Sequence, residues 1–138
     1  MAKRSPRRSG CPLNATLEAL GDQWSLLVIR DLLFVGRRTF KEFLEAGEGV
    51  ASNILADRLQ SLETEGIISK RRDPQDARRF RYLLTAKGLD LAPVLVEMIL
   101  WGARYHRTDA PAAAIREMTR NRDRFIAAAR ARAGEELR

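Results

Sequence analysis

The sequence has few of the residues on which metal sites, disulfide frameworks and catalytic centres depend. It contains one cysteine, Cys11, and one histidine, His106. A single cysteine excludes a disulfide framework within the chain and is typical of a reducing compartment. No cysteine or carboxylate cluster stands at ligand spacing from His106, and no glycine-rich phosphate loop occurs. The sequence therefore predicts no enzyme, no metal site and no cofactor.

Long apolar runs are also absent. The most apolar stretch is interrupted by Glu97, and it is well short of the ~20 residues that span a bilayer. Residues 1–10 are basic but run into Pro12 and an amphipathic segment, so we expect a flexible basic tail and no signal peptide. These absences predict a cytoplasmic protein without membrane contact.

Positive charge is abundant, in contrast. The 138 residues carry a net charge of +7, and the excess is concentrated in residues 1–10, 67–85 and 112–138. An anionic partner is the first expectation for such a chain. With 45% hydrophobic residues, the chain can bury the core of one compact domain.

Apolar residues at helical spacing predict four helices in the first half of the chain. They are expected at residues 13–20, 23–35, 40–46 and 52–65. Thr39 and Glu42 fit a capping box at the start of the third. Leu55, Leu59 and Leu62 form the inner face of the fourth. A short turn with two glycines joins these last two helices, which is the skeleton of a helix-turn-helix.

The second half of the chain begins with a change of period. Residues 67–72 and 80–84 are expected to form a β-hairpin around a turn that contains Pro74. A long apolar helix is predicted over residues 86–107, with Pro93 kinking it or resetting its start. A last helix is predicted over residues 112–133. This order predicts a mainly α fold with a small β-hairpin (α+β), namely a winged helix-turn-helix with flanking dimerisation helices.

The winged helix supplies candidate DNA-binding residues of two kinds. The helix at 52–65 can lie in the major groove, where Asn53 and Gln60 have the amide geometry that reads adenine. The hairpin carries six basic residues that can neutralise phosphates of the adjacent backbone or minor groove, although a solvated charged turn is the alternative. The full candidate set is Ser52, Asn53, Ala56, Asp57, Arg58 and Gln60 on the helix, Lys70, Arg71, Arg72, Arg78, Arg79 and Arg81 on the hairpin, and Arg37, Arg38 and Thr39 before the third helix.

Several segments resemble a known family in its own order. They are Cys11-Pro12-Leu13 and the segments 21–33, 38–43, 51–59 and 84–88. Over residues 11–105 the chain is similar to the HxlR-type winged-helix transcriptional regulators, within the wider MarR-like group. The resemblance implies a homodimer that binds a palindromic operator in double-stranded DNA, with the first and later helices forming the dimer interface. The arginine-rich hairpin tip, 73–79, and the helix beyond 112 depart from the family pattern.

The resemblance and the helix periods together divide the chain into three parts. We expect a tail at 1–10, an HxlR-type domain including the dimerisation helix at 11–107, and a C-terminal helical extension at 108–138. The expected dimer residues are Leu13, Leu17, Leu91, Leu95, Met98, Trp101 and Tyr105. The expected mode is repression, and a winged-helix module for protein–protein or non-specific nucleic-acid binding is the alternative.

Two regulatory hypotheses remain open at this point. Cys11 follows Arg7 and Arg8, and nearby cations favour the reactive thiolate. Some HxlR-type regulators are similar in having an N-terminal cysteine that senses oxidants or electrophiles, so Cys11 is a possible redox residue; a partly buried, inert cysteine is the alternative. A small-molecule effector could also bind in a pocket lined by Trp24, Phe34, Met98 and Trp101, although such residues are more often plain core.

Overall fold

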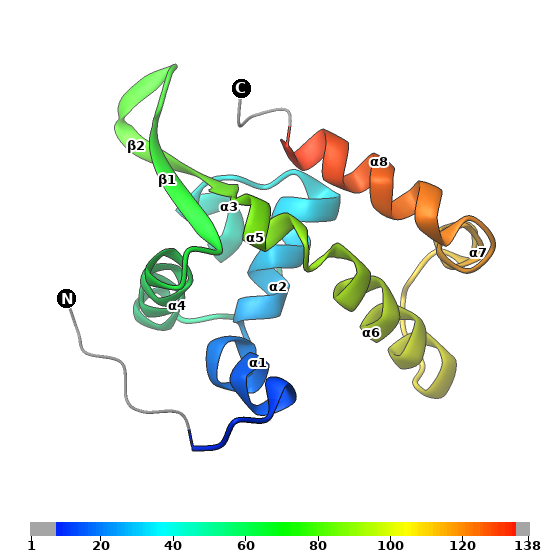
Figure 1. Cartoon of the computed structure of the whole chain (residues 1–138). Helices are drawn as coiled ribbons and strands as arrows, with labels where there is room; N and C mark the ends of the chain where they lie inside the picture. The colour runs from blue at the N-terminus through cyan, green and yellow to red at the C-terminus, as the bar shows by residue number, and fades with distance from the viewer. Residues whose placement is uncertain (1–7, 135–138) are drawn as a thin grey trace.

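Helices and one β-hairpin make up residues 8–134, the part of the chain that the computed structural model describes (Figure 1). The mainly α fold with a small β-hairpin is confirmed. The elements are α1 (Pro12–Leu20), α2 (Ser25–Arg30), η1 (Asp31–Val35), α3 (Phe40–Leu44), α4 (Ser52–Thr64), β1 (Ile68–Asp73), β2 (Asp76–Leu84), α5 (Ala86–Leu89), α6 (Ala92–Tyr105), α7 (Ala112–Arg120) and α8 (Arg122–Gly134). No helix in this described part is long and apolar enough to span a membrane.

The core lies where α2, η1, α4 and α6 meet. Ile29 and Val96 are fully buried there. Leu55, Leu59 and Leu62 of α4 point into the same core, as their spacing predicts. Because one face of α4 is held in this way, the residues between the leucines face outward.

The helix predicted at residues 23–35 is two elements in the structure. It begins at Ser25, because the backbone N–H groups of Trp24 and Ser25 donate to Asp22 Oδ2 at 2.9 Å. It then widens into the π-helix η1, which closes when the N–H of Gly36 donates to the Asp31 carbonyl at 2.8 Å. Gly36 takes a φ of 91°, which favours glycine. Asp31 is buried at the start of η1, and π-turns of this kind often occur at functional sites.

Two further helix boundaries differ from the prediction. The helix expected at 112–133 breaks at Asn121, and this break turns α8 back so that Phe125 packs against Phe34 of η1 at 5.7 Å between ring centroids. α3 also ends at Leu44 rather than at residue 46. Pro93 stands in the first turn of α6. This position agrees with the expectation that a proline resets the start of the long helix.

The hairpin forms the wing of the fold. β1 and β2 are antiparallel, and the register pairs Lys70 with Tyr82, Arg71 with Arg81, and Arg72 with Phe80. The backbone N–H of Tyr82 donates to the Arg38 carbonyl at 2.7 Å and so ties the wing to the segment before α3. α8 lies across η1 and α6 and reaches the base of the wing with its C-terminal end (Figure 1).

Candidate nucleic-acid interface

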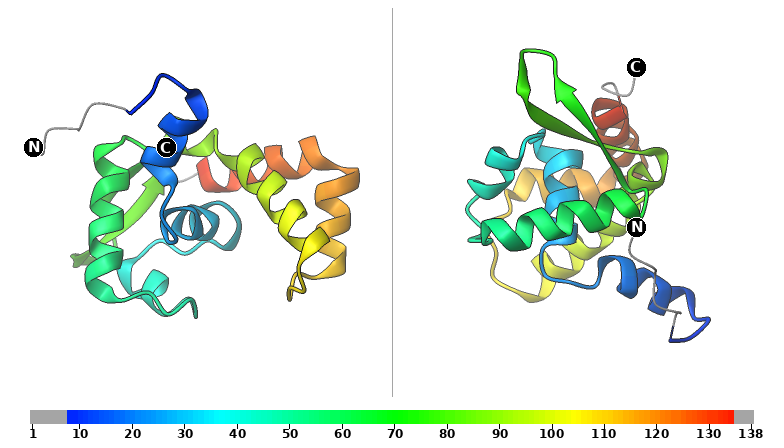
Figure 2. Two further views of the ribbon diagram at one scale, coloured as in Figure 1. Left: turned by 90° about the horizontal axis from the view of Figure 1, so that it is seen from below. Right: turned by 90° about the vertical axis from the view of Figure 1, so that its left-hand side faces the viewer.

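The outer face of α4 is polar and open to solvent. Ser52, Asn53, Ala56, Asp57 and Gln60 are exposed, as the leucine spacing predicts. α4 and the wing lie on the same side of the molecule, with α4 crossing in front of the base of the wing (Figure 2, right). A helix and a hairpin in this arrangement can contact adjacent grooves of one duplex.

Arg58 differs from its neighbours on α4 because it is engaged within the chain. Its guanidinium pairs with Asp57 and lies 3.7 Å from Asp22 Oδ1. Burial alone would raise the pKa of Asp22, but hydrogen bonds from Ser25 and Trp24 and the charge of Arg58 outweigh it and hold that pKa below its ordinary value. Arg58 therefore ties α4 to the start of α2.

One face of the wing turns two cations toward an aromatic ring. Lys70 Nζ lies 4.3 Å from the centroid of the Phe80 ring, and the guanidinium of Arg72 lies 5.1 Å from it. Tyr82, on the same face, packs against Phe43 at 6.0 Å between centroids. Burial, together with the charge of Glu63, raises the pKa of Tyr82. Lys70 and Tyr82 border a groove of about 270 Å³ whose other side is α4 with Gln60.

Carboxylates at the tip of the wing neutralise the positive charge of two arginines there. Arg79 Nε donates to Asp73 Oδ2 at 2.6 Å, and Arg78 Nε donates to Asp76 Oδ1 at 3.2 Å. The backbone N–H of Gln75 and the Arg79 guanidinium lower the pKa of Asp73. Hydrogen bonds from Arg78 lower the pKa of Asp76. The arginine-rich tip thus presents less free charge than its sequence indicates.

Lys70, Arg71 and Arg72 are the wing cations without a carboxylate partner among residues 8–134, but Arg72 Nη1 donates to the Ala77 carbonyl at 2.6 Å, which leaves Lys70 and Arg71. Both are exposed. Arg81 is half-buried opposite Arg71 and lines a small pocket with Arg38 and Asp73. Within the described chain, Lys70 and Arg71 are therefore the wing cations most available to a phosphate.

The candidate contacts before α3 have roles inside the chain. Arg37 Nη1 lies 2.8 Å from Oδ1 of the buried Asp31. Arg38 Nη1 donates to the carbonyls of Leu32 and Arg37 at 2.9 and 3.0 Å. Thr39 is 9% exposed and forms the predicted capping box with Glu42. Contacts of these residues with DNA remain predictions, since their side chains already position the start of α3.

Exposed apolar side chains gather on α1 and on α6. Leu13 and Leu17 of α1 are 66% and 55% exposed. On α6, an exposed stripe at helical spacing is formed by Val94, Met98, Trp101 and Tyr105. Two of the expected dimer residues are not on these exposed surfaces, because Leu95 lies in the core and Leu91 is half-buried. Val94 was missing from the expected set, although its i, i+4 spacing from Met98 could have identified it.

Residues 19–110 match the family model described as HxlR-like helix-turn-helix. This match covers most of the chain, including α4 and the wing. The chain belongs to the HxlR-like helix-turn-helix family. Members of this family are transcriptional regulators, and the matched residues run from the end of α1 past the end of α6, with the helix-turn-helix and the wing between them.

Relatives of this HxlR-like protein include an uncharacterised HTH-type transcriptional regulator, sll1512, from Synechocystis sp. The two are 40% identical over 88 residues, which is 64% of each chain. The HTH-type transcriptional regulator YodB of Bacillus subtilis is 32% identical over 96 residues, covering 69% of this chain and 85% of YodB. The structure of PA1607 matches with a TM-score of 0.68 and 35% identity, over 77% of this chain and 72% of that one.

The remaining sequence hypotheses concern regulation of this HxlR-like protein. Cys11 is exposed at the N-terminal boundary of α1. Arg7 and most of the basic tail lie outside the described residues, and Arg8 Nη2 donates to Asn14 at 2.9 Å. Of the four residues expected around an effector, Phe34 packs on Phe125, whereas Met98 and Trp101 are 52% and 62% exposed on α6. Among residues 8–134, no three His, Cys, Asp or Glu side chains are grouped so that they could hold a metal ion.

Proposed function

We propose that the protein is a homodimeric transcriptional regulator that reads a palindromic operator in double-stranded DNA. α4 lies in the major groove, and the β1–β2 wing contacts the adjacent backbone or minor groove. The observation that carries this proposal is the placement of the exposed polar face of α4 and the basic wing on one side of the molecule (Figure 2). Family membership supports the same function.

The two DNA-contacting elements have unequal duties in this proposal. α4 offers Asn53 and Gln60, whose amide groups can form bidentate hydrogen bonds with adenine, but its Arg58 is neutralised. Attraction to the backbone therefore comes from the wing, above all from Lys70 and Arg71, because phosphate neutralisation dominates binding energy. Discrimination comes from α4.

Dimerisation is proposed through the exposed apolar stripe of α6 and through Leu13 and Leu17 of α1. Large exposed apolar patches of this kind mark interaction sites in soluble proteins. A two-fold arrangement presents two α4 helices to half-sites about 34 Å apart, one turn of the duplex. We assign repression as the mode, because a dimer seated on an operator excludes other proteins from the DNA that it covers.

The test begins with selection of bound sequences from a random duplex library, followed by affinity measurements at several salt concentrations. Asn53→Ala should relax the sequence preference, with a loss of about 1–3 kcal/mol on the preferred site. Arg71→Gln should weaken binding to all sequences and reduce the log–log salt slope by about 0.9. Arg78→Gln should do the same to a smaller extent, because Asp76 already compensates Arg78.

Arg116→Gln on α7 is the matched control, because Arg116 is exposed and removing it changes the net charge equally. It should leave both affinity and salt slope nearly unchanged. If Asn53→Ala and Arg71→Gln had the same effect, the division of duties would be wrong. Equal binding to any nucleic acid, or no binding, would favour the alternative of a non-specific or protein-binding module.

A redox role of Cys11 is a second candidate function. It is favoured by the exposure of Cys11 at the start of α1. It is also favoured by similarity to the redox regulator HypR, whose oxidised form matches with a TM-score of 0.63 and 25% identity over 71% of this chain and all of that one. Two Cys11 thiols from two subunits would lose two electrons and two protons to diamide, which forms one disulfide and the corresponding hydrazine.

Mass spectrometry and operator binding after diamide treatment test this role, with Cys11→Ser as the control. The expected result is a disulfide-linked dimer and a changed operator affinity for the native chain alone. An unmodified Cys11 with unchanged operator binding would refute the sensing function.

A further inference from the structure

Asp57 is an acidic residue at the centre of the outer face of α4. Its side chain is 61% exposed. It lies between Asn53 and Gln60, one helical turn from each, and opposite the buried leucines of the same helix. In the proposed complex, this carboxylate faces the base edges and is also repelled by the phosphates on both sides of the major groove.

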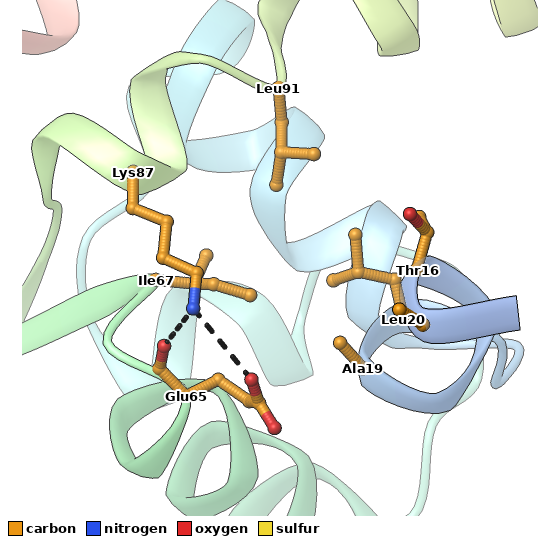
Figure 3. Close-up of a pocket in the computed structure, with 8 residues that line it drawn as sticks. Thr16, Ala19, Leu20, Glu65, Ile67, Lys87 and Leu91 are labelled. Carbon is orange, nitrogen blue, oxygen red and sulfur yellow. Dashed lines mark hydrogen bonds and ion pairs between the residues drawn. The ribbon is translucent and has the colours of Figure 1, made fainter. Parts of the chain in front are cut away.

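The acids near the C-terminal end of α4 lie away from this position. Glu63 borders the groove between α4 and the wing, beside Lys70. Glu65 follows the end of α4, and its carboxylate lies 3.8 Å from Lys87 Nζ of α5 (Figure 3). Asp57 is therefore the acid of α4 that lies among the base-reading residues.

Arg58 compensates part of the charge of Asp57. Its guanidinium donates to Oδ2 of Asp57 and lies 3.7 Å from Asp22 Oδ1, so it stands between two carboxylates. This pairing lowers the cost of bringing Asp57 toward DNA. A carboxylate accepts several hydrogen bonds, so Oδ1 of Asp57 remains able to accept one from a ligand.

Few groups on the bases suit such an acceptor. In the major groove, guanine presents N7 and O6 and thymine presents O4, which are all acceptors, whereas adenine and cytosine each present an amino group. Adenine also places its N7 acceptor beside that amino group, where it repels a carboxylate. A carboxylate that loses water without gaining a donor carries a large free-energy cost. Cytosine is therefore the base that complements Asp57 best.

We propose that Asp57 is a specificity-determining residue whose Oδ1 accepts a hydrogen bond from the N4 amino group of one cytosine in each half-site. This role rests on the proposed function and deepens it, because α4 then reads cytosine through Asp57 and adenine through Asn53 and Gln60. At guanine or thymine, the same carboxylate meets acceptors and weakens binding. Asp57 thus raises the ratio of operator affinity to non-specific affinity.

Selection of bound sequences from a random duplex library tests this role in the native chain, Asp57→Ala and Asp57→Asn. The native chain should require cytosine at one position of each half-site. Asp57→Ala should lose that preference and bind non-specific duplexes more tightly, because the repulsion between its carboxylate and the phosphates is gone. Asp57→Asn should shift the preference toward adenine, which an amide reads through N6 and N7.

Asp123→Ala is the matched control, because the Asp123 side chain is 99% exposed on α8 and its removal changes the net charge equally. It should leave the sequence preference unchanged. Asp57→Ala should unfold in urea like the native chain, since an exposed ion pair contributes little to stability. A loss of base preference in this variant then reflects the missing carboxylate and not a misfolded helix.

An operator with N4-methylcytosine at the selected position of both half-sites isolates the hydrogen bond. The methyl group replaces the amino hydrogen that faces the major groove and leaves the pairing with guanine in place. The change should weaken binding of the native chain by about tenfold and that of Asp57→Ala by less than about twofold. The same modification of a cytosine outside the half-sites should have no effect.

Three results would overturn the role of Asp57 and leave the proposed function intact. They are a preferred operator without such a cytosine, an unchanged cytosine preference in Asp57→Ala, and an equal effect of N4-methylation on the native chain and Asp57→Ala. Absence of any preferred sequence for the native chain would overturn the proposed function together with this role.

Discussion

At the scale of the residue, Gly88 has almost no room for a side chain. A Cβ atom there would meet the Ile67 carbonyl oxygen at 2.3 Å and Leu84 Cδ2 at 2.8 Å. Gly88→Ala should therefore lower the free energy of unfolding by about 1–3 kcal/mol, measured by urea denaturation. Gly102→Ala is the control, because its Cβ would meet nothing within 4 Å and alanine favours a helix interior. Equal stability of the two variants would contradict the close approach of α5 to the α4–β1 junction.

The exposure of a side chain can be predicted from nearby residues in the sequence, whereas the ion-pair partner of an arginine often cannot. The outward position of Asn53 and Gln60 follows from the leucine period of their own helix, and the structure confirms it. The partners of Arg58 include Asp22, which lies far away in the chain. No local pattern specifies such a pair, so the sequence named Arg58 and Arg37 as candidate DNA contacts without predicting the ion pairs with Asp22 and Asp31 that the fold forms.

At the scale of the element, α8 is held by small buried residues. Ala129 is fully buried where α8 crosses the core, whereas Ala128 beside it is exposed. Ala129→Leu should displace α8 and lower the free energy of unfolding by about 1–3 kcal/mol. Ala128→Leu should change it by less than about 0.5 kcal/mol. Chemical denaturation and hydrogen exchange of η1 would measure both effects, and unchanged exchange of η1 in Ala129→Leu would argue against this docking.

Element boundaries were predictable where a cap or a proline sets them. The capping box at Thr39 and the start of α6 near Pro93 both depend on neighbouring residues in the chain. The π-turn at Asp31 and the break at Asn121 do not follow from neighbouring residues, because they satisfy tertiary contacts. Burial of Asp31 with Arg37 and packing of Phe125 on Phe34 need the folded chain.

At the scale of the whole molecule, the α6 stripe should determine the oligomeric state. Met98 is 52% exposed in the middle of the stripe, so Met98→Arg would place a charge in the proposed interface. It should yield a monomer by light scattering at micromolar concentration and lose operator binding. Val35→Arg is the control, because Val35 is similarly exposed (53%) but lies on η1. A native chain that is itself monomeric, or a dimeric Met98→Arg, would contradict the interface.

Acid should destabilise the molecule through a set of carboxylates. Although burial opposes it, hydrogen bonds lower the pKa of Asp22 below 3.8 and that of Glu42 below 4.5. A lowered folded-state pKa means that the ionised group stabilises the fold at neutral pH and that this contribution is lost as the pH falls through the folded-state pKa. Urea titrations should therefore show constant stability from pH 7 to about 5 and a decrease below. Asp22→Asn should make that decrease shallower; an identical pH profile would refute the contribution of Asp22.

α1 projects from the body of the molecule (Figure 2, right). In the proposed dimer, this projection makes assembly depend on the concentration of the protein itself. With Leu13 and Leu17 largely exposed, α1 has little of its own chain to pack against. In the proposed dimer, the partner supplies that packing, so assembly and stability both rise with the amount of protein. Occupancy of the operator then follows roughly the square of the monomer concentration while monomers prevail, and a modest change in synthesis becomes a steep change in the response.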